Sequence, residues 1–200
     1  MVKRSEVRHT PGMRYMELSS SVRSLFWGGL LLILCCGFYL GWWVLAYRPH
    51  SPVRGMASGW LLLPALAFGL FGVVQIVSGN GMLAKRISPG VIITTGLGLY
   101  VLLLILSKVL FHRLVTTELL LIVGWTLLLV LEINALRGGG GFSAFKAVAV
   151  LFLVFAVAVV SMICYLRYYS LSAEAGYRDG MIPLILVMAC EAVVSFCILF

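Results

Sequence analysis

The feature that most constrains this chain is a series of six apolar segments, each about twenty residues long, separated by short polar stretches. They cover residues 25–47, 59–77, 90–110, 116–136, 142–165 and 181–200. A helix needs about 20 apolar residues to cross the hydrocarbon core of a bilayer, so each segment is long enough to span it once. None shows the sustained alternation of a membrane β-strand. The sequence therefore predicts an all-α, polytopic membrane protein, a single bundle of six transmembrane helices.

The composition agrees with this class and excludes others. Of the 200 residues, 62% are hydrophobic and only 11% are charged, whereas a soluble domain carries about 25% charged residues. The net charge of +8 does not indicate nucleic-acid binding, because five of the fifteen Lys and Arg residues precede the first span and the others lie mostly in short loops. Basic residues at these places are typical of topology signals. The expected partner is the lipid bilayer, not nucleic acid.

The distribution of basic residues also predicts an orientation. Six spans put both termini on one side, and with the N-terminus inside, the inner segments hold about nine Lys and Arg residues against six outside. We therefore expect cytoplasmic N- and C-termini in a multi-pass protein of the cell membrane. Residues 1–24 form a basic tail in which Tyr15, Leu18 and Val22 recur at helical spacing. This tail is either an interfacial helix leading into the first span or a partly disordered segment.

The fourth segment, residues 116–136, is unusual because it carries Glu118 near one end and Glu132 near the other. At about 100° per residue, Glu118, Trp125 and Glu132 fall within roughly 40° of one another, so one side of the helix is acidic and aromatic. A helix that contacted only lipid would not need such a side. We expect it to face other helices or water at the membrane ends.

Glu191 is the residue of this chain that most strongly suggests a functional role. It lies near the middle of the sixth span, roughly 16 Å from either expected interface. A charged carboxylate facing lipid at that depth costs about 3 kcal/mol or more, so we expect it to be protonated, paired, hydrogen-bonded or in contact with water. Pro183 is expected in the first turn of the same helix, where proline is tolerated.

Two interpretations of the acidic residues stay open. In the first, Glu118, Glu191 and Glu132 form an outer-to-inner series that binds a cation, a proton or a basic solute. The polar or aromatic residues that would bind the ligand are Glu191, Glu132, Glu118, Gln75, Thr94, Thr95 and Trp125. In the second, Glu118 and Glu132 are interfacial residues, Glu191 holds its span to a neighbouring helix, and Trp125 is a packing residue.

The chain shows no motif of a catalytic, metal or cofactor site. A Gly-x-Ser-x-Gly nucleophile elbow and a His-Glu-x-x-His pair are missing, and Asp179 is the only aspartate. The cysteines have no metal-ligand spacing and lie inside apolar spans, where they are expected as small buried residues: Cys35, Cys36, Cys164, Cys190 and Cys197. We expect no cofactor and no metal, and an enzyme, for example one that modifies lipids, is the least favoured class.

The first span contains Gly37 and Gly41, a small-xxx-small spacing that lets two helix backbones approach closely. These glycines would contact either another span of the chain, a second copy of it, or a different membrane protein. The function that we expect is binding or translocation of a small solute or ion through the bundle. The alternative is a non-catalytic accessory or assembly subunit of a larger membrane complex.

Overall fold

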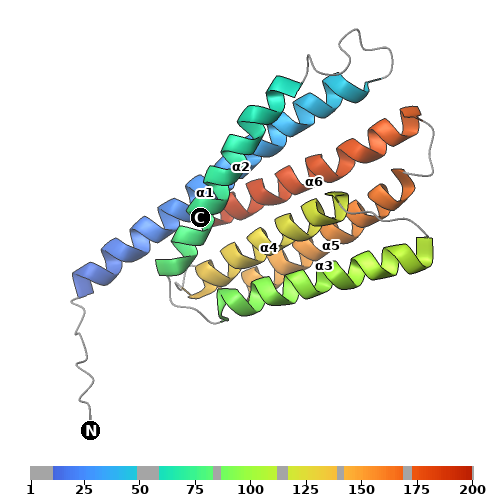
Figure 1. Cartoon of the computed structure of the whole chain (residues 1–200). Coiled ribbons are helices and arrows are strands. Elements are labelled where there is room, and N and C mark those ends of the chain that lie inside the picture. Colours follow the sequence, from blue (N-terminus) through green and yellow to red (C-terminus); the bar gives the residue numbers. More distant parts are fainter. Residues whose placement is uncertain are drawn as a thin grey trace.

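The computed structural model describes residues 11–48, 59–82, 87–111, 117–138, 142–168 and 173–199. Within these ranges the chain forms six helices and no strand (Figure 1). The helices are α1 (Pro11–Tyr47), α2 (Leu62–Met82), α3 (Pro89–Phe111), α4 (Thr117–Gly138), α5 (Ala144–Tyr168) and α6 (Ala173–Leu199). This confirms the predicted all-α bundle.

Each helix contains a segment long and apolar enough to cross a bilayer. The segments are Ser20–Tyr47, Gly59–Asn80, Pro89–Val109, Leu119–Gly138, Ala144–Arg167 and Tyr177–Cys197. They agree with the six predicted spans to within a few residues at most ends. The protein is therefore a multi-pass membrane protein.

Two helices begin earlier than the apolar pattern predicts. The α1 helix begins at Pro11, ahead of its apolar span at Ser20, and its first turns project beyond the bundle (Figure 1). The α6 helix begins at Ala173, so Pro183 lies in the helix interior and its predicted place in the first turn is wrong. Hydropathy marks only the part of a helix that lies in lipid, whereas polar residues can continue the same helix in water.

Successive helices run in opposite directions, so α1 begins and α6 ends at the same end of the bundle (Figure 1). We call this the terminal end, and the other the opposite end. The α1 helix packs along α2 and α6, while α4 packs against α2, α3, α5 and α6. Every residue from Leu131 to Leu136 of α4 is buried, so the second half of α4 is the centre of the bundle.

Glycines let α1 and α2 approach closely. A Cβ atom on Gly28 would lie 3.2 Å from the carbonyl oxygen of Gly72, and one on Gly72 would lie 3.1 Å from the carbonyl oxygen of Gly28. At Gly37, by contrast, nothing from the described part of the chain would lie within 4 Å of a Cβ, and Gly41 approaches only Leu61, at 3.8 Å. Gly28 and Gly72 thus take part in the close approach of α1 and α2, whereas a contact of Gly37 with a partner chain stays a prediction.

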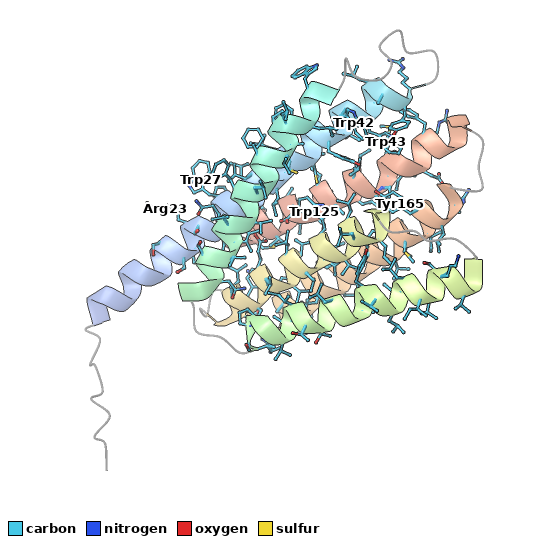
Figure 2. All side chains as sticks on the ribbon, viewed as in Figure 1. Arg23, Trp27, Trp42, Trp43, Trp125 and Tyr165 are labelled. Carbon is cyan, nitrogen blue, oxygen red and sulfur yellow. The ribbon has the colours of Figure 1, made fainter. Side chains whose placement is uncertain are left out.

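At the opposite end, aromatic side chains connect α1 to α6. Figure 2 shows Trp42 and Trp43 near the last turns of α1, at the opposite end of the bundle. The indole Nε1 of Trp43 donates a hydrogen bond of 3.2 Å to the carbonyl oxygen of Tyr177, and the ring lies against Gly180, where a Cβ atom would collide with it. Tryptophans are enriched at membrane interfaces, which agrees with a position at the membrane surface.

Candidate functional site

Glu132 of α4 and Glu191 of α6 lie together where these helices meet α1. Both side chains are 0% exposed. A Cβ atom on Gly29 of α1 would lie 3.6 Å from Oε2 of Glu191, 3.7 Å from Oε1 of Glu132 and 2.6 Å from Oγ of Ser195. Three oxygen-bearing side chains from α4 and α6 therefore surround one glycine of α1. We call Glu132 and Glu191 the acidic pair.

The position of each member follows from helical spacing. On α4, Ile122, Leu129 and Glu132 are buried at intervals of seven and three residues, which places them on one stripe of the helix. On α6, Glu191 and Ser195 are four residues apart and so share a face, one turn from each other. Gly29 contributes by having no side chain, since a methyl group there would occupy the space taken by the hydroxyl of Ser195.

The oxygens of this cluster have no hydrogen-bond partner in the described part of the chain. Among the residues that the structure describes, neither carboxylate oxygen of Glu132 or of Glu191 accepts a hydrogen bond, and the Ser195 hydroxyl makes none. The two carboxylates are also close to each other, because an oxygen of each lies within 4 Å of the same Cβ position on Gly29. Burying one unpaired charge costs several kcal/mol, and a second charge of the same sign beside it adds repulsion. At least one member of the pair therefore needs to be protonated or neutralised by a cation.

The acidic pair lies at one depth in the membrane. Oxygens of both carboxylates approach the same position on Gly29, and Glu132 lies six residues, or about 9 Å, before Gly138, where the apolar segment of α4 ends at the terminal end. The series from one membrane face to the other is therefore not observed for these two residues, which lie side by side. The interpretation of Glu132 as an interfacial residue is wrong, because its side chain is fully buried in the centre of the bundle.

The other predicted ligands lie away from the acidic pair. Gln75 is exposed on α2, where Oγ of Ser24 donates to its Oε1 at 2.6 Å and to its backbone oxygen at 2.9 Å. Thr94 and Thr95 are exposed on α3. The backbone of Glu118 belongs to α4, about 21 Å along the helix from Glu132, and its side chain lies outside the described residues.

Trp125 lies on α4 seven residues before Glu132 and lines a small cavity between α4, α5 and α6. It does not reach the acidic pair, since seven residues correspond to about 10 Å along a helix. Gly29 and Ser195 were not singled out by the sequence. The spacing of Ser195 from Glu191 places the two on one face, but that signal did not show which other helix this face would meet.

Two asparagines hold the second half of α4 in place. The Nδ2 of Asn80, at the end of α2, donates to the carbonyl oxygen of Leu131 at 3.2 Å, and the Nδ2 of Asn134 donates to that of Ile87 at 3.0 Å. Leu131 directly precedes Glu132, and Oδ1 of Asn80 has no hydrogen-bond partner among the described residues. Polar groups therefore continue from the acidic pair toward the terminal end.

The described residues contain no group of three His, Cys, Asp or Glu side chains that could hold a metal ion. Two carboxylates and a hydroxyl are oxygen ligands, which suit a proton or a hard cation and not a soft transition metal. No family model, curated protein or solved structure matches this chain. Fold and site together define a six-helix membrane protein with an acidic site in its core.

Proposed function

We propose that this protein binds a small cation, either a proton or a bare alkali-metal ion, at the acidic pair and carries it across the membrane. The observation that supports this is the set of five buried oxygens, those of Glu132, Glu191 and Ser195, which lack partners in the described structure. A cation would neutralise the pair and complete the coordination of these oxygens. The close packing at Gly29 favours a ligand of atomic size over a larger basic solute.

The same chain shows why a purely structural role is the weaker explanation. The α1 and α2 helices hold together through glycines and the apolar side chains of Leu25, Leu32 and Ile76, without any buried carboxylate. Helices in lipid associate well through such packing alone, and intramembrane ionisable residues usually mark a ligand pathway. Two glutamates at one helix junction are therefore better explained by a bound ligand than by helix association.

The proposed location is the cell membrane, with both termini in the cytoplasm. The support is the excess of Lys and Arg in the segments on the side of the termini, about nine against six. With this orientation the acidic pair lies nearer to the cytoplasmic face, and Asn80 and Asn134 lie between the pair and the cytoplasm.

The test is cation flux into proteoliposomes, measured with an internal pH dye for protons and with radioactive sodium for the alkali-metal ion. We expect Glu132→Gln and Glu191→Gln each to lower the flux at least ~10-fold, since the amide cannot be deprotonated and carries no charge. The matched control is Ser107→Ala, because Ser107 is buried but bonds to Leu104 of its own helix at 2.9 Å. A wild-type flux equal to that of protein-free liposomes under both gradients would contradict the proposal.

A second candidate function, an accessory subunit, is favoured by one observation. Gly37 is exposed on α1, and no described atom of the chain would touch a Cβ there, so its surface could receive a helix of another protein. Affinity purification of the wild type and of Gly37→Leu distinguishes the two candidates. A membrane partner that is retained by the wild type and lost from the variant, together with no cation flux, would replace the first proposal by the second.

A further inference from the structure

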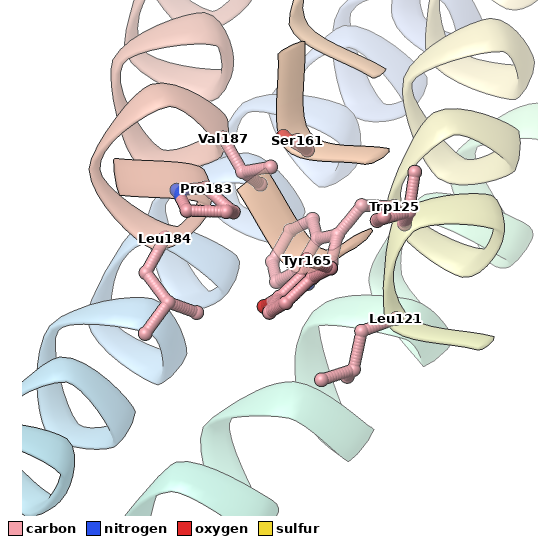
Figure 3. A pocket seen from close by; sticks show the side chains of 8 residues that line it. Leu121, Trp125, Ser161, Tyr165, Pro183, Leu184 and Val187 are labelled. Carbon is pink, nitrogen blue, oxygen red and sulfur yellow. The ribbon is translucent and has the colours of Figure 1, made fainter. Parts of the chain in front are cut away.

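A cavity of about 20 Å³ lies between α4, α5 and α6, on the side of the acidic pair that faces the opposite end of the bundle. In Figure 3, Leu121 and Trp125 of α4 line one side, Pro183, Leu184 and Val187 of α6 line the other, and Ser161 and Tyr165 of α5 lie between them. A cavity needs roughly 10–15 Å³ to hold a water molecule. This cavity therefore has room for one water and not for a larger ligand.

The cavity offers polar atoms that a water would satisfy. Ser161 is 0% exposed, and its hydroxyl has no hydrogen-bond partner among the described residues. A helical serine or threonine usually bonds to the carbonyl four residues earlier, as Thr126 does with Ile122 at 2.7 Å, but Ser161 does not. An apolar cavity stays dry, whereas an unsatisfied buried hydroxyl favours a bound water.

Further polar groups are present in the cavity lining or one turn from it. Trp125 contributes an indole N–H, and Tyr165 contributes a hydroxyl. Pro183 has no N–H and lies in the interior of α6, so the carbonyl group of Asp179, four residues earlier, loses its usual helical donor. Together with the Ser161 hydroxyl, these groups are the candidates for the two to four partners that an ordered water needs.

The cavity and the acidic pair lie along the same contact between α4 and α6. Trp125 is seven residues before Glu132, and Val187 is four residues before Glu191, which correspond to about 10 Å and about 6 Å along the two helices. On α4 the intervening position is occupied by Leu129, which is 2% exposed, and on α6 Val187 of the cavity lining directly precedes Glu191 on the same face. One apolar layer thus separates the cavity from the pair.

We propose that this cavity holds one ordered water bound to Ser161. We further propose that the cation passes through this hydrated cavity on its way from the opposite end of the bundle to the acidic pair. The role in access rests on the proposed function, whereas the bound water does not. Leu129 and Val187 then form the barrier between the two sites, and a rearrangement of these two side chains would admit the cation.

The water is tested by hydroxyl-radical footprinting of the wild type in detergent or lipid, because radicals generated from a bound water oxidise the side chains beside it. We expect Tyr165, 6% exposed, to be labelled several-fold faster than Phe142, 5% exposed, after correction for intrinsic reactivity. Ser161→Ala should lose this labelling, and the control Thr126→Val should keep it. Equal corrected rates for Tyr165 and Phe142 in the wild type would overturn the proposal without any variant.

The access role is tested by comparing the flux of Ser161→Ala with that of Glu191→Gln. We expect Ser161→Ala to slow cation flux about 3- to 10-fold, because it removes one group on the access pathway and leaves the acidic pair intact. Thr126→Val should leave the flux unchanged. A flux that is lost in Glu191→Gln but unchanged in Ser161→Ala would overturn the access role and leave the proposed function standing. An absence of flux in every protein would overturn both, while the footprint would still report on the water.

Discussion

Gly28 and Gly29 are neighbours on α1, yet they serve two different regions of the molecule. Gly28 faces α2, where a Cβ atom would lie 2.6 Å from Cγ1 of Ile76 and 3.2 Å from backbone atoms of Gly72 and Ile76. Gly29 faces α4 and α6, where the three atoms nearest to a Cβ would be side-chain oxygens, those of Ser195, Glu191 and Glu132. At the first interface the missing side chain brings two backbones together, and at the second it leaves space for a polar cluster.

The difference shows which part of the bundle is built for stability alone. Between α1 and α2, glycines and apolar side chains form the buried contact, as expected for helices that associate in lipid by van der Waals packing, and the Ser24–Gln75 hydrogen bond lies at its exposed side. At the junction of α1, α4 and α6, buried oxygens without described partners add a cost that packing does not require. A region that retains costly polar groups is the one to examine for function.

The largest effect is expected from Gly28→Leu, which inserts a side chain into the backbone contact between α1 and α2. We expect a loss of about 3 kcal/mol in the free energy of unfolding, because neither Gly72 nor the Ile76 backbone can move aside. Unfolding by sodium dodecyl sulfate, followed by circular dichroism in mild detergent, measures this loss. Gly37→Leu is the matched control on the same helix and should change stability little, and an equal loss in both variants would show that Gly28 has no special place.

A smaller effect is expected from Gly29→Ala, because its Cβ atom would meet the hydroxyl of Ser195, which can rotate away. We expect a loss of about 1–2 kcal/mol. The double variant Gly29→Ala/Ser195→Ala should recover about 1 kcal/mol of it, since the oxygen that the methyl group meets is removed. The same unfolding assay is applied to the wild type, the two single variants and the double variant. If the two single losses in the free energy of unfolding add up to that of the double variant, Gly29 and Ser195 do not touch.

The smallest effect is expected from Gln75→Leu, which removes the hydrogen bond between Ser24 and Gln75 at the exposed side of α1 and α2. Hydrogen bonds between membrane helices contribute about 0.6 kcal/mol on average, so we expect a loss of that size. Cation flux should stay at the wild-type level, because Gln75 belongs to α2 and lies outside the acidic cluster. A flux that fell as far as in Glu191→Gln would instead make Gln75 a ligand, as its polarity alone suggested.

Several features of the acidic site follow from the sequence, and others do not. Glu191 could be singled out because a carboxylate in the middle of an apolar span is costly wherever its helix packs. Its neighbour could not be predicted, since the seven-residue spacing of Glu118, Trp125 and Glu132 gives one face of α4 but not the helix that this face meets. Gly37 and Gly41 carried the more obvious packing spacing, yet Gly28 and Gly72 make the close contact.

The sequence by itself determined the class of protein, because the hydrocarbon core requires apolar helices of a fixed minimum length and the chain contains six of them. It also determined that Glu191 needs a proton, a partner or water. Only the tertiary structure decided that Glu132 supplies a second carboxylate at the same depth, that Gly29 and Ser195 complete the cluster, and that Ser161 lines a separate cavity. The reason is physical: helix periodicity is a local property of the chain, whereas the pairing of faces depends on how all six helices pack at once.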